Sequence, residues 1–347
     1  MEKTKILSIC IPTYNRKDKL DTCLSFLLDD YKGLEEKIEI VISDNCSTDN
    51  TEGLVKEKYP IFYKNYFRTD KNYGAYKNFY NVVLMATGKF VWLIGDDDII
   101  LPGIIQQLVE LIENDNSFEY IMVNDYNWKP ESNNQSNLTK EGIINLVSSK
   151  KVNISVNDFK TRYVNKVIDF VEFRQDAFTP IYSNIMLREH WVETNKLGFE
   201  SSKKYKRFSN LLSCNANSFW IVKNLYNRKG LYFGTPALLV SFDVGWSDYL
   251  MVWFFKILPE LYSLEKKYGA DEGLIRKYKS EWLKFSYLII ESFKKDNKNK
   301  QASFDFLSFV LYFHDSKNFW PNLFVITKEY LKSSLKKIIL RLKTYFL

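Results

Sequence analysis

The chain has 347 residues and a net charge of +7, from 49 Lys and Arg against 42 Asp and Glu. Hydrophobic residues make up 46% of it and charged residues 26%, which excludes a largely disordered chain. The length suits one large domain or two of ordinary size, and the charge excess is too mild to predict a nucleic-acid partner. The four cysteines show no CxxC spacing and only two histidines are present, so neither a disulfide framework nor a zinc site is expected.

Short apolar runs and helical periodicities alternate through the first third of the chain. The expected strands cover 6–11, 38–43, 61–67, 90–94 and 120–123, and the expected helices cover 16–29, 52–59, 75–86 and 102–113. This β-α-β-α order predicts an α/β fold with an open, mostly parallel sheet and helices on both faces. The pattern loosens after Asn124, with strand candidates at 181–187 and 237–242, and the chain is expected to be helical from about residue 250.

Three consecutive carboxylates, Asp96–Asp98, directly follow the expected strand 90–94. Ligands of open α/β sheets bind at the carboxyl edge, where this cluster would lie. A hard divalent cation would relieve the mutual repulsion of the three acids, and Mg²⁺ or Mn²⁺ combines carboxylates with substrate phosphate oxygens. The alternative is an acidic cluster at the start of the helix that Pro102 opens, which explains one Asp more easily than three. The sequence therefore predicts metal binding by this cluster.

Two further strand ends carry candidate binding residues. Asp44 ends the second strand and could accept a hydrogen bond from the imide N–H of a uracil or thymine ring, although a simple turn residue remains equally open. Asp49 is expected to cap the helix that follows it. After the first strand, Pro12 fixes the exit of the chain, and Thr13 and Tyr14 then offer backbone and side-chain groups to a ligand.

Four motifs occur in order at successive strand ends: IPTYNR, VISDNCSTDNT, NYGAYKN and ATGKFVWLIGDDD. Together they resemble the GT-A-type glycosyltransferases of family 2 over about residues 4–125, most of all the abequosyltransferase-like bacterial sugar transferases. The resemblance implies a nucleotide-sugar-binding half over 1–127 and an acceptor-binding half over 128–255. It leaves 256–347 as a helical C-terminal region that ends in a basic amphipathic helix.

The resemblance also implies roles for individual residues. Those placed around the donor nucleotide are Pro12, Thr13, Tyr14, Arg16, Asp44, Asn72, Gly74, Lys77, Asp96 and Asp97. Asp96–Asp98 would form the DxD-like element, with Asp98 and Asp96 on a Mn²⁺ or Mg²⁺ ion. Gly95 stands where the usual D-x-D-D spelling has its first acid, so the Asp that binds the metal directly stays open.

An inverting transfer needs a carboxylate base for the acceptor hydroxyl, opposite the departing nucleoside diphosphate. Many family members carry this base in a Glu-Asp pair, but the corresponding region here, 213–218, contains no acid. Asp248 is the first candidate because it follows an expected strand and a glycine. The alternatives are Asp243, Asp176 and Glu200.

The last twenty residues form a separate signal. Residues 328–347 hold six basic residues and one acid, a net charge of +5, with the apolar residues on one helical face. Such a helix is typical of segments that lie in an anionic membrane interface. A terminal helix packed on the protein, with its lysines in solvent, is the alternative.

These features favour a metal-dependent, inverting glycosyltransferase of bacterial surface polysaccharide (O-antigen or capsule) synthesis. Its expected partners are a nucleotide-diphosphate sugar and a saccharide acceptor on a polyprenyl diphosphate, and its expected place is the cytoplasmic face of the membrane. A nucleotidyltransferase is a second hypothesis, but it would normally need a Gly-rich loop that IPTYNRKD does not provide. A third is an inactive membrane-surface scaffold with the same fold, which the absent Glu-Asp pair would explain.

Overall fold

The computed structural model describes residues 4–115, 117–128, 139–149, 151–174, 176–206, 209–241, 252–286, 306–317, 319–328 and 331–332. The chain divides into two compact units. The first unit comprises 1–204 and 215–244, and the second comprises 205–214 and 245–347. Within the described part of the chain, no helix is long and apolar enough to cross a bilayer. The expected boundaries at 127 and 255 concern binding roles and stay predictions.

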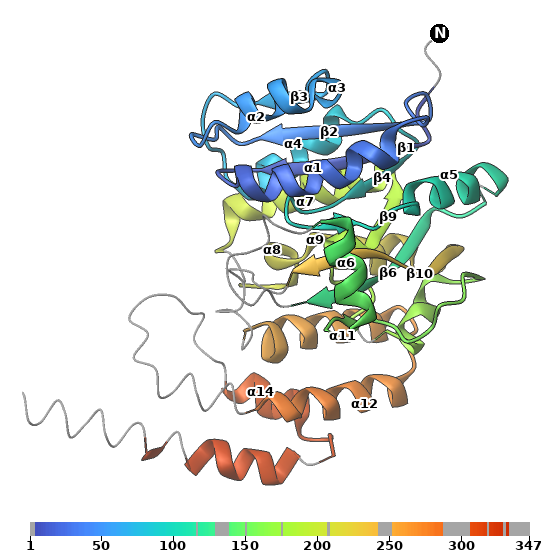
Figure 1. The fold of residues 1–347 in the computed structure, drawn as a ribbon. Helices are drawn as coiled ribbons and strands as arrows, with labels where there is room; N and C mark the ends of the chain where they lie inside the picture. The colour runs from blue at the N-terminus through green and yellow to red at the C-terminus, as the bar shows by residue number, and fades with distance from the viewer. Residues whose placement is uncertain are drawn as a thin grey trace, which may run out of the picture. The chain divides into compact units, whose positions relative to one another are not determined.

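One sheet organises the first unit (Figure 1). Its strands are β1 (Leu7–Thr13), β2 (Ile38–Asp44), β3 (Tyr66–Arg68), β4 (Phe90–Leu93), β5 (Ile99–Ile100), β6 (Tyr120–Trp128), β7 (Asn153–Ile154), β8 (Arg162–Val164), β9 (Asn184–Leu187) and β10 (Gly230–Ser241). The order is β3-β2-β1-β4-β9-β6-β10-β5, with β7 beside β6 and β8 beside β10. Strands β1 to β4 pair in parallel, whereas β9 is antiparallel to both of its neighbours.

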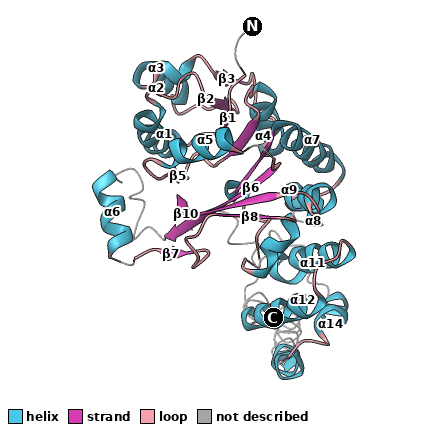
Figure 2. Cartoon of the chain, turned by 90° about the vertical axis from the view of Figure 1, so that its right-hand side faces the viewer, coloured by secondary structure: helices cyan, strands magenta, loops and turns pink. Residues whose placement is uncertain are grey.

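Helices cover both faces of this sheet. Those of the first unit are α1 (Lys17–Tyr31), α2 (Thr51–Lys58), α3 (Pro60–Tyr63), α4 (Ala75–Met85), α5 (Ile104–Asn114), α6 (Lys140–Ser148), α7 (Arg188–Lys204) and α9 (Ala216–Trp220). Figure 2 shows α1 and α5 on one side of the strands, and α4 and α7 on the other. Leu20, Leu24 and Leu27 of α1 are fully buried, as their helical spacing requires. The expected α/β fold with helices on both faces is confirmed.

The second unit is helical in the part that the structure describes. Its helices are α8 (Leu211–Cys214), α11 (Leu258–Lys267), α12 (Glu272–Trp282), α14 (Phe306–Phe313) and a helix over 319–328. The expectation of a helical C-terminal region is thereby confirmed for these ranges.

Some expected elements differ from the observed ones. The expected strand 61–67 is wrong in its first half, because Pro60 opens the short helix α3 and only Tyr66–Arg68 pairs with β2. The antiparallel strands β5, β7 and β8 were not expected, since each is only two or three residues long and has no period to detect.

Strand register brings the motif residues together. Thr13 pairs with Asp44 across β1 and β2, and Cys10 pairs with Leu93 across β1 and β4, so the carboxyl ends of three strands meet at one edge. After the acids the chain enters β5, where Ile99 pairs with Leu239 of β10. The acidic turn is therefore anchored at both ends, by β4 before it and by β5 after it.

Candidate active site

The acidic turn after β4 is held by residues from the β1–α1 segment. The hydroxyl of Thr13 donates to Asp96 Oδ2 at 2.7 Å, and Arg16 Nη1 lies 2.7 Å from Asp96 Oδ1. Arg16 also contacts the carboxylate of Asp97, and Lys19 Nζ lies 3.6 Å from the same group. Two of the residues expected around the nucleotide, Thr13 and Arg16, thus contact the acids directly.

A tight turn positions the third acid. Asp98 Oδ2 accepts a hydrogen bond from the backbone N–H of Gly95 at 2.7 Å, and the N–H of Asp98 donates to the carbonyl of Gly95 at 3.2 Å. A Cβ atom at Gly95 would lie 2.8 Å from Asp97 Oδ1 and 3.1 Å from Asp98 Oδ2. In this turn, a side chain at position 95 would displace the carboxylates, which gives a physical reason for glycine there.

Burial and mutual repulsion raise the pKa values of Asp96 and Asp98. The pKa of Asp96 is raised to about 6, mainly by burial. The charge of Arg16 acts to lower this pKa, and the charge of Asp97 acts to raise it. The pKa of Asp98 is also raised well above its usual range, by burial first and by the carboxylate of Asp97 next. A divalent cation would relieve this repulsion, and an all-oxygen donor set suits Mn²⁺ or Mg²⁺. The residues present therefore fit the expected metal.

Protein ligands alone do not enclose such an ion. Among the described residues, no group of three or more His, Cys, Asp or Glu side chains is arranged to hold a metal. A site of this kind takes its remaining ligands from substrate phosphate oxygens and water, as Mg²⁺ sites commonly do.

Asp44 is fully buried at the end of β2 and its carboxylate is already engaged. Oδ1 accepts from the backbone N–H of Ser47 at 2.9 Å and from the Ser47 hydroxyl. Oδ2 accepts from the Tyr66 hydroxyl at 2.6 Å, and Arg68 Nε lies 3.7 Å away. The carboxylate shapes this strand end, and its contact with a base stays a prediction.

A loop of the third motif packs against the same edge. Asn45 Nδ2 and the N–H of Gly74 both donate to Asn72 Oδ1 at 2.8 Å. Gly74 has φ +85°, a conformation that glycine adopts without strain, and it precedes α4. On α4, Asn78 donates to the carbonyl of Thr13 at 3.1 Å. The third motif is therefore joined to Thr13 through Asn78, and the roles of Asn72 and Gly74 toward a nucleotide stay predictions.

The other residues that were expected to contact the nucleotide differ in their surroundings. Pro12 is buried within β1, whereas Tyr14 is exposed just after it. Lys77 Nζ lies 5.1 Å from the ring centres of both Tyr80 and Phe199. Their roles toward a nucleotide stay predictions.

Asp49 contacts the starts of two helices. Asp49 Oδ1 accepts from the hydroxyl of Thr51 at 2.6 Å, at the first residue of α2, the helix that it was expected to cap. Asp49 Oδ2 accepts from the N–H of Lys17 at 2.9 Å, at the first residue of α1, which was not expected. Thr48 N–H donates to Asn15 Oδ1 at 2.7 Å, which folds this loop over the β1–α1 turn.

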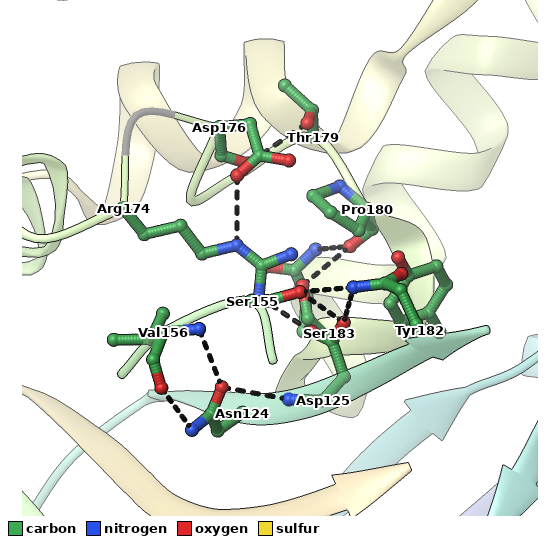
Figure 3. Close-up of polar contacts among 12 residues, drawn as sticks. Asn124, Asp125, Ser155, Val156, Arg174, Asp176, Thr179, Pro180, Tyr182 and Ser183 are labelled. Atoms are coloured by element: carbon green, nitrogen blue, oxygen red, sulfur yellow. Dashed lines mark hydrogen bonds and ion pairs between the residues drawn. The ribbon is translucent and has the colours of Figure 1, made fainter. Parts of the chain in front are cut away.

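Sequence reasoning missed a buried ion pair (Figure 3). Arg174 Nη1 lies 2.7 Å from Asp125 Oδ1, and both side chains are almost completely buried. Asp125 Oδ2 accepts from Asn127 at 3.0 Å and from the hydroxyl of Ser155 at 2.5 Å. Burial acts to lower the pKa of Arg174, but the carboxylates of Asp125 and Asp176 raise it well above its usual range. Neither residue stands in a recognisable motif.

Asp176 extends from this ion pair toward solvent. Arg174 Nε lies 3.0 Å from Asp176 Oδ1, and the Asp176 side chain is 39% exposed. The described residues provide no hydrogen bond to Asp176 Oδ2. Arg174 therefore holds one carboxylate in the interior and a second one at the surface.

Tyr182 connects this group with the acidic turn. Its carbonyl accepts from Trp92 Nε1 of β4 at 2.7 Å. Burial raises the pKa of its hydroxyl, and the charge of Asp125 is the next cause.

The structure says less about the other candidates for the catalytic base. Asp248 and Asp243 lie outside the described residues. Glu200 is exposed on α7 and makes no ion pair with the acidic turn in the described part of the chain. Of the basic segment 328–347, the structure describes only Lys328, Leu331 and Lys332.

The parallel strand ends, the acidic turn after β4 and the motif loops around it form a GT-A-type fold. The model of the family described as glycosyl transferase family 2 matches residues 8–191, more than half of the chain. The chain belongs to this family.

Individual relatives match shorter stretches. Abequosyltransferase RfbV of Salmonella typhimurium is 40% identical over 98 residues, which cover 27% of this chain and 28% of RfbV. The GalNAc(5)-diNAcBac-PP-undecaprenol beta-1,3-glucosyltransferase of Campylobacter jejuni is 31% identical over 107 residues, which cover 30% of this chain and 33% of the relative. The chain thus matches a third or less of these relatives' lengths. The crystal structure of S. aureus TarS 1–349 aligns with a TM-score of 0.50 at 16% identity, over 94% of this chain and 80% of that one, which supports the fold alone.

Proposed function

We propose that this protein is a glycosyltransferase that moves a sugar from a nucleotide-diphosphate donor to a saccharide acceptor in bacterial surface polysaccharide synthesis, with inversion at the anomeric carbon. The acidic turn at the end of β4 carries the proposal. Its acids Asp96 and Asp98 are buried, have raised pKa values and lie beside Thr13 and Arg16 of the first motif.

Asp98 and Asp96 would hold a Mn²⁺ or Mg²⁺ ion together with diphosphate oxygens of the donor. Such an ion supplies positive charge where negative charge develops on the leaving nucleoside diphosphate. Arg16 and Lys19 hold Asp96 and Asp97 on the side of the first motif, so the acids are pre-oriented before a ligand arrives.

Among the four candidates, we propose Asp176 as the base that takes the proton of the acceptor hydroxyl. Its exposure leaves Oδ2 accessible to an acceptor, while Arg174 holds Oδ1. The hydrogen bond between Trp92 of β4 and Tyr182, six residues after Asp176, supports a place near the donor site. A base held by a fixed partner loses little orientation freedom before the reaction.

The proposed acceptor is linked to a polyprenyl diphosphate, and the proposed place of action is the cytoplasmic face of the membrane. The name of the Campylobacter relative, which includes an undecaprenol-linked saccharide, supports this acceptor class. The basic segment 328–347 supports contact with an anionic membrane surface.

A donor screen tests the proposal. Calorimetry of the full chain with UDP, CDP, GDP and dTDP, each with and without Mn²⁺, should reveal one nucleotide that binds more tightly with the metal. Hydrolysis of one sugar nucleotide of that base should follow in a donor panel. Failure of all four nucleotides to bind would refute the donor assignment.

A further inference from the structure

The helix over 319–328 in the second unit has apolar side chains on both of its faces. Phe319 and Ile326 are fully buried on the inner face. The outer apolar face, by contrast, is exposed by 49–71% and consists of Trp320, Phe324 and Val325. A surface helix normally presents polar residues to solvent, and contiguous exposed apolar residues mark interaction sites.

A cationic depression of about 640 Å³ adjoins this outer apolar face. Trp320 belongs to both, and the cationic side chains of the depression are Arg276, Lys277 and Lys317. The depression also contains Asp315, but Lys279 Nζ lies 3.4 Å from its carboxylate. In the described part of the chain, none of these three cations forms an ion pair, so the depression carries net positive charge, which suits an anionic partner.

We propose that the outer apolar face and the cationic depression dock on an anionic phospholipid bilayer. Aromatic side chains lie at the level of the lipid headgroups while neighbouring Lys and Arg contact the phosphates. The residues of this surface precede the basic segment 328–347, and all of them belong to the second unit. The docking proposal rests on the proposed function in one respect only, that the protein acts at a membrane.

Charge argues against a second copy of the chain as the occupant. A symmetric contact would place the same patch on both partners, so the cationic depressions of Arg276, Lys277 and Lys317 would come close to each other. Like charges at such a contact repel each other. An anionic surface meets both the apolar and the cationic parts without this conflict.

Vesicle cosedimentation of the full chain tests the docking. Wild type should bind vesicles with about 30% phosphatidylglycerol and bind neutral phosphatidylcholine vesicles much less. The variant Trp320→Gln/Phe324→Gln should bind anionic vesicles about fivefold or more weakly. Arg276→Gln/Lys277→Gln/Lys317→Gln should lose most of the difference between the two vesicle types. Ile144→Gln, at a residue 66% exposed in the first unit, is the matched control and should bind as wild type does.

Bromine-labelled phosphatidylglycerol separates this face from the C-terminal segment. It should quench wild-type fluorescence more than that of Trp320→Phe, because the difference reports Trp320 alone. Nucleotide binding, measured on the same variants, should stay unchanged, so that loss of docking is distinguished from failure of the transferase proposal.

Three results would overturn the docking proposal. They are absence of wild-type binding to anionic vesicles, wild-type binding by Trp320→Gln/Phe324→Gln, and equal quenching of wild type and Trp320→Phe. A change from dimer to monomer in ultracentrifugation, with vesicle binding unchanged, would assign the face to self-association instead.

Discussion

Arg16 bridges two acids of the turn after β4: its Nη1 lies 2.7 Å from Asp96 Oδ1, and its Nη2 contacts Asp97. Burial acts to lower the pKa of Arg16, but these carboxylates raise it overall. A cation from the first motif thus partly neutralises the acids proposed to hold a second, divalent cation. The balance between these two cations underlies several of the predictions below.

Replacing Asp98 with Asn should stabilise the fold while removing activity. The pKa of Asp98 is higher in the folded chain than in the unfolded chain, so its ionisation destabilises the fold as pH rises above about 4. In EDTA, Asp98→Asn should therefore melt a few degrees above wild type at pH 8, and the difference should shrink toward pH 4. Sugar transfer should fall about 100-fold or more. A melting difference that does not vary with pH would contradict this explanation.

Manganese affinity should weaken in mild acid. With a pKa of about 6 for Asp96, protons compete with the metal below that pH. Calorimetry should show an apparent affinity that falls by up to about tenfold per pH unit below pH 6 for each proton displaced. An affinity that stays constant from pH 7 to pH 5 would exclude Asp96 as a ligand.

Arg16→Gln should shift this pH dependence upward. Without the guanidinium, the pKa of Asp96 rises further, because Arg16 is the largest influence that lowers it. The manganese binding profile should then move to higher pH, whereas the exposed Lys196→Gln should leave it in place. The same calorimetric series measures both variants, and an unchanged midpoint in Arg16→Gln would count against the ion pair in solution.

Asp176→Asn should lower kcat by about 100-fold or more with little change in the donor KM. Its side chain is 39% exposed, so the substitution should leave the melting temperature close to that of wild type. Glu200→Gln, on exposed α7, is the matched control and should retain activity. Full turnover by Asp176→Asn would move the base to Asp248 or Asp243.

The buried pair Asp125–Arg174 should show strong coupling in a double-mutant cycle. Arg174→Gln or Asp125→Asn alone leaves a buried charge without its partner and should cost about 3–5 kcal/mol. The double variant should cost clearly less than the sum, because neither charge remains. Denaturant unfolding followed by tryptophan fluorescence measures the cycle, and additive costs would disprove the coupling.

The parallel part of the fold could be predicted because its signals are local. Apolar runs marked β1, β2 and β4, and parallel strands end at one edge, so Thr13, Asp44 and Asp96 were expected together. The chain between 61 and 65 was misjudged because an apolar run of this length does not distinguish a strand from the short helix that Pro60 begins.

Contacts between residues far apart in the sequence could not be predicted. Arg174 and Asp125 are 49 positions apart, and no spacing rule joins them. Asp49 has the residue type of a helix cap, but only the folded loop determines that it also contacts the start of α1. Asp176 was an alternative to Asp248 among the candidate bases, and no sequence pattern predicted its contact with the buried Arg174.

The acidic turn can be anchored at both ends only after β10 has been synthesised, because β5 pairs with β10. Ile99 and Ile100 emerge soon after Asp98, but their partners Leu239 and Leu238 follow only near the end of the first unit. A nascent chain that has completed β4 can therefore anchor the turn at one end only. Truncated proteins that stop before Leu238 would lack the second anchor, whatever motifs they retain. The geometry of Asp98 would therefore be completed only when nearly the whole first unit has been synthesised.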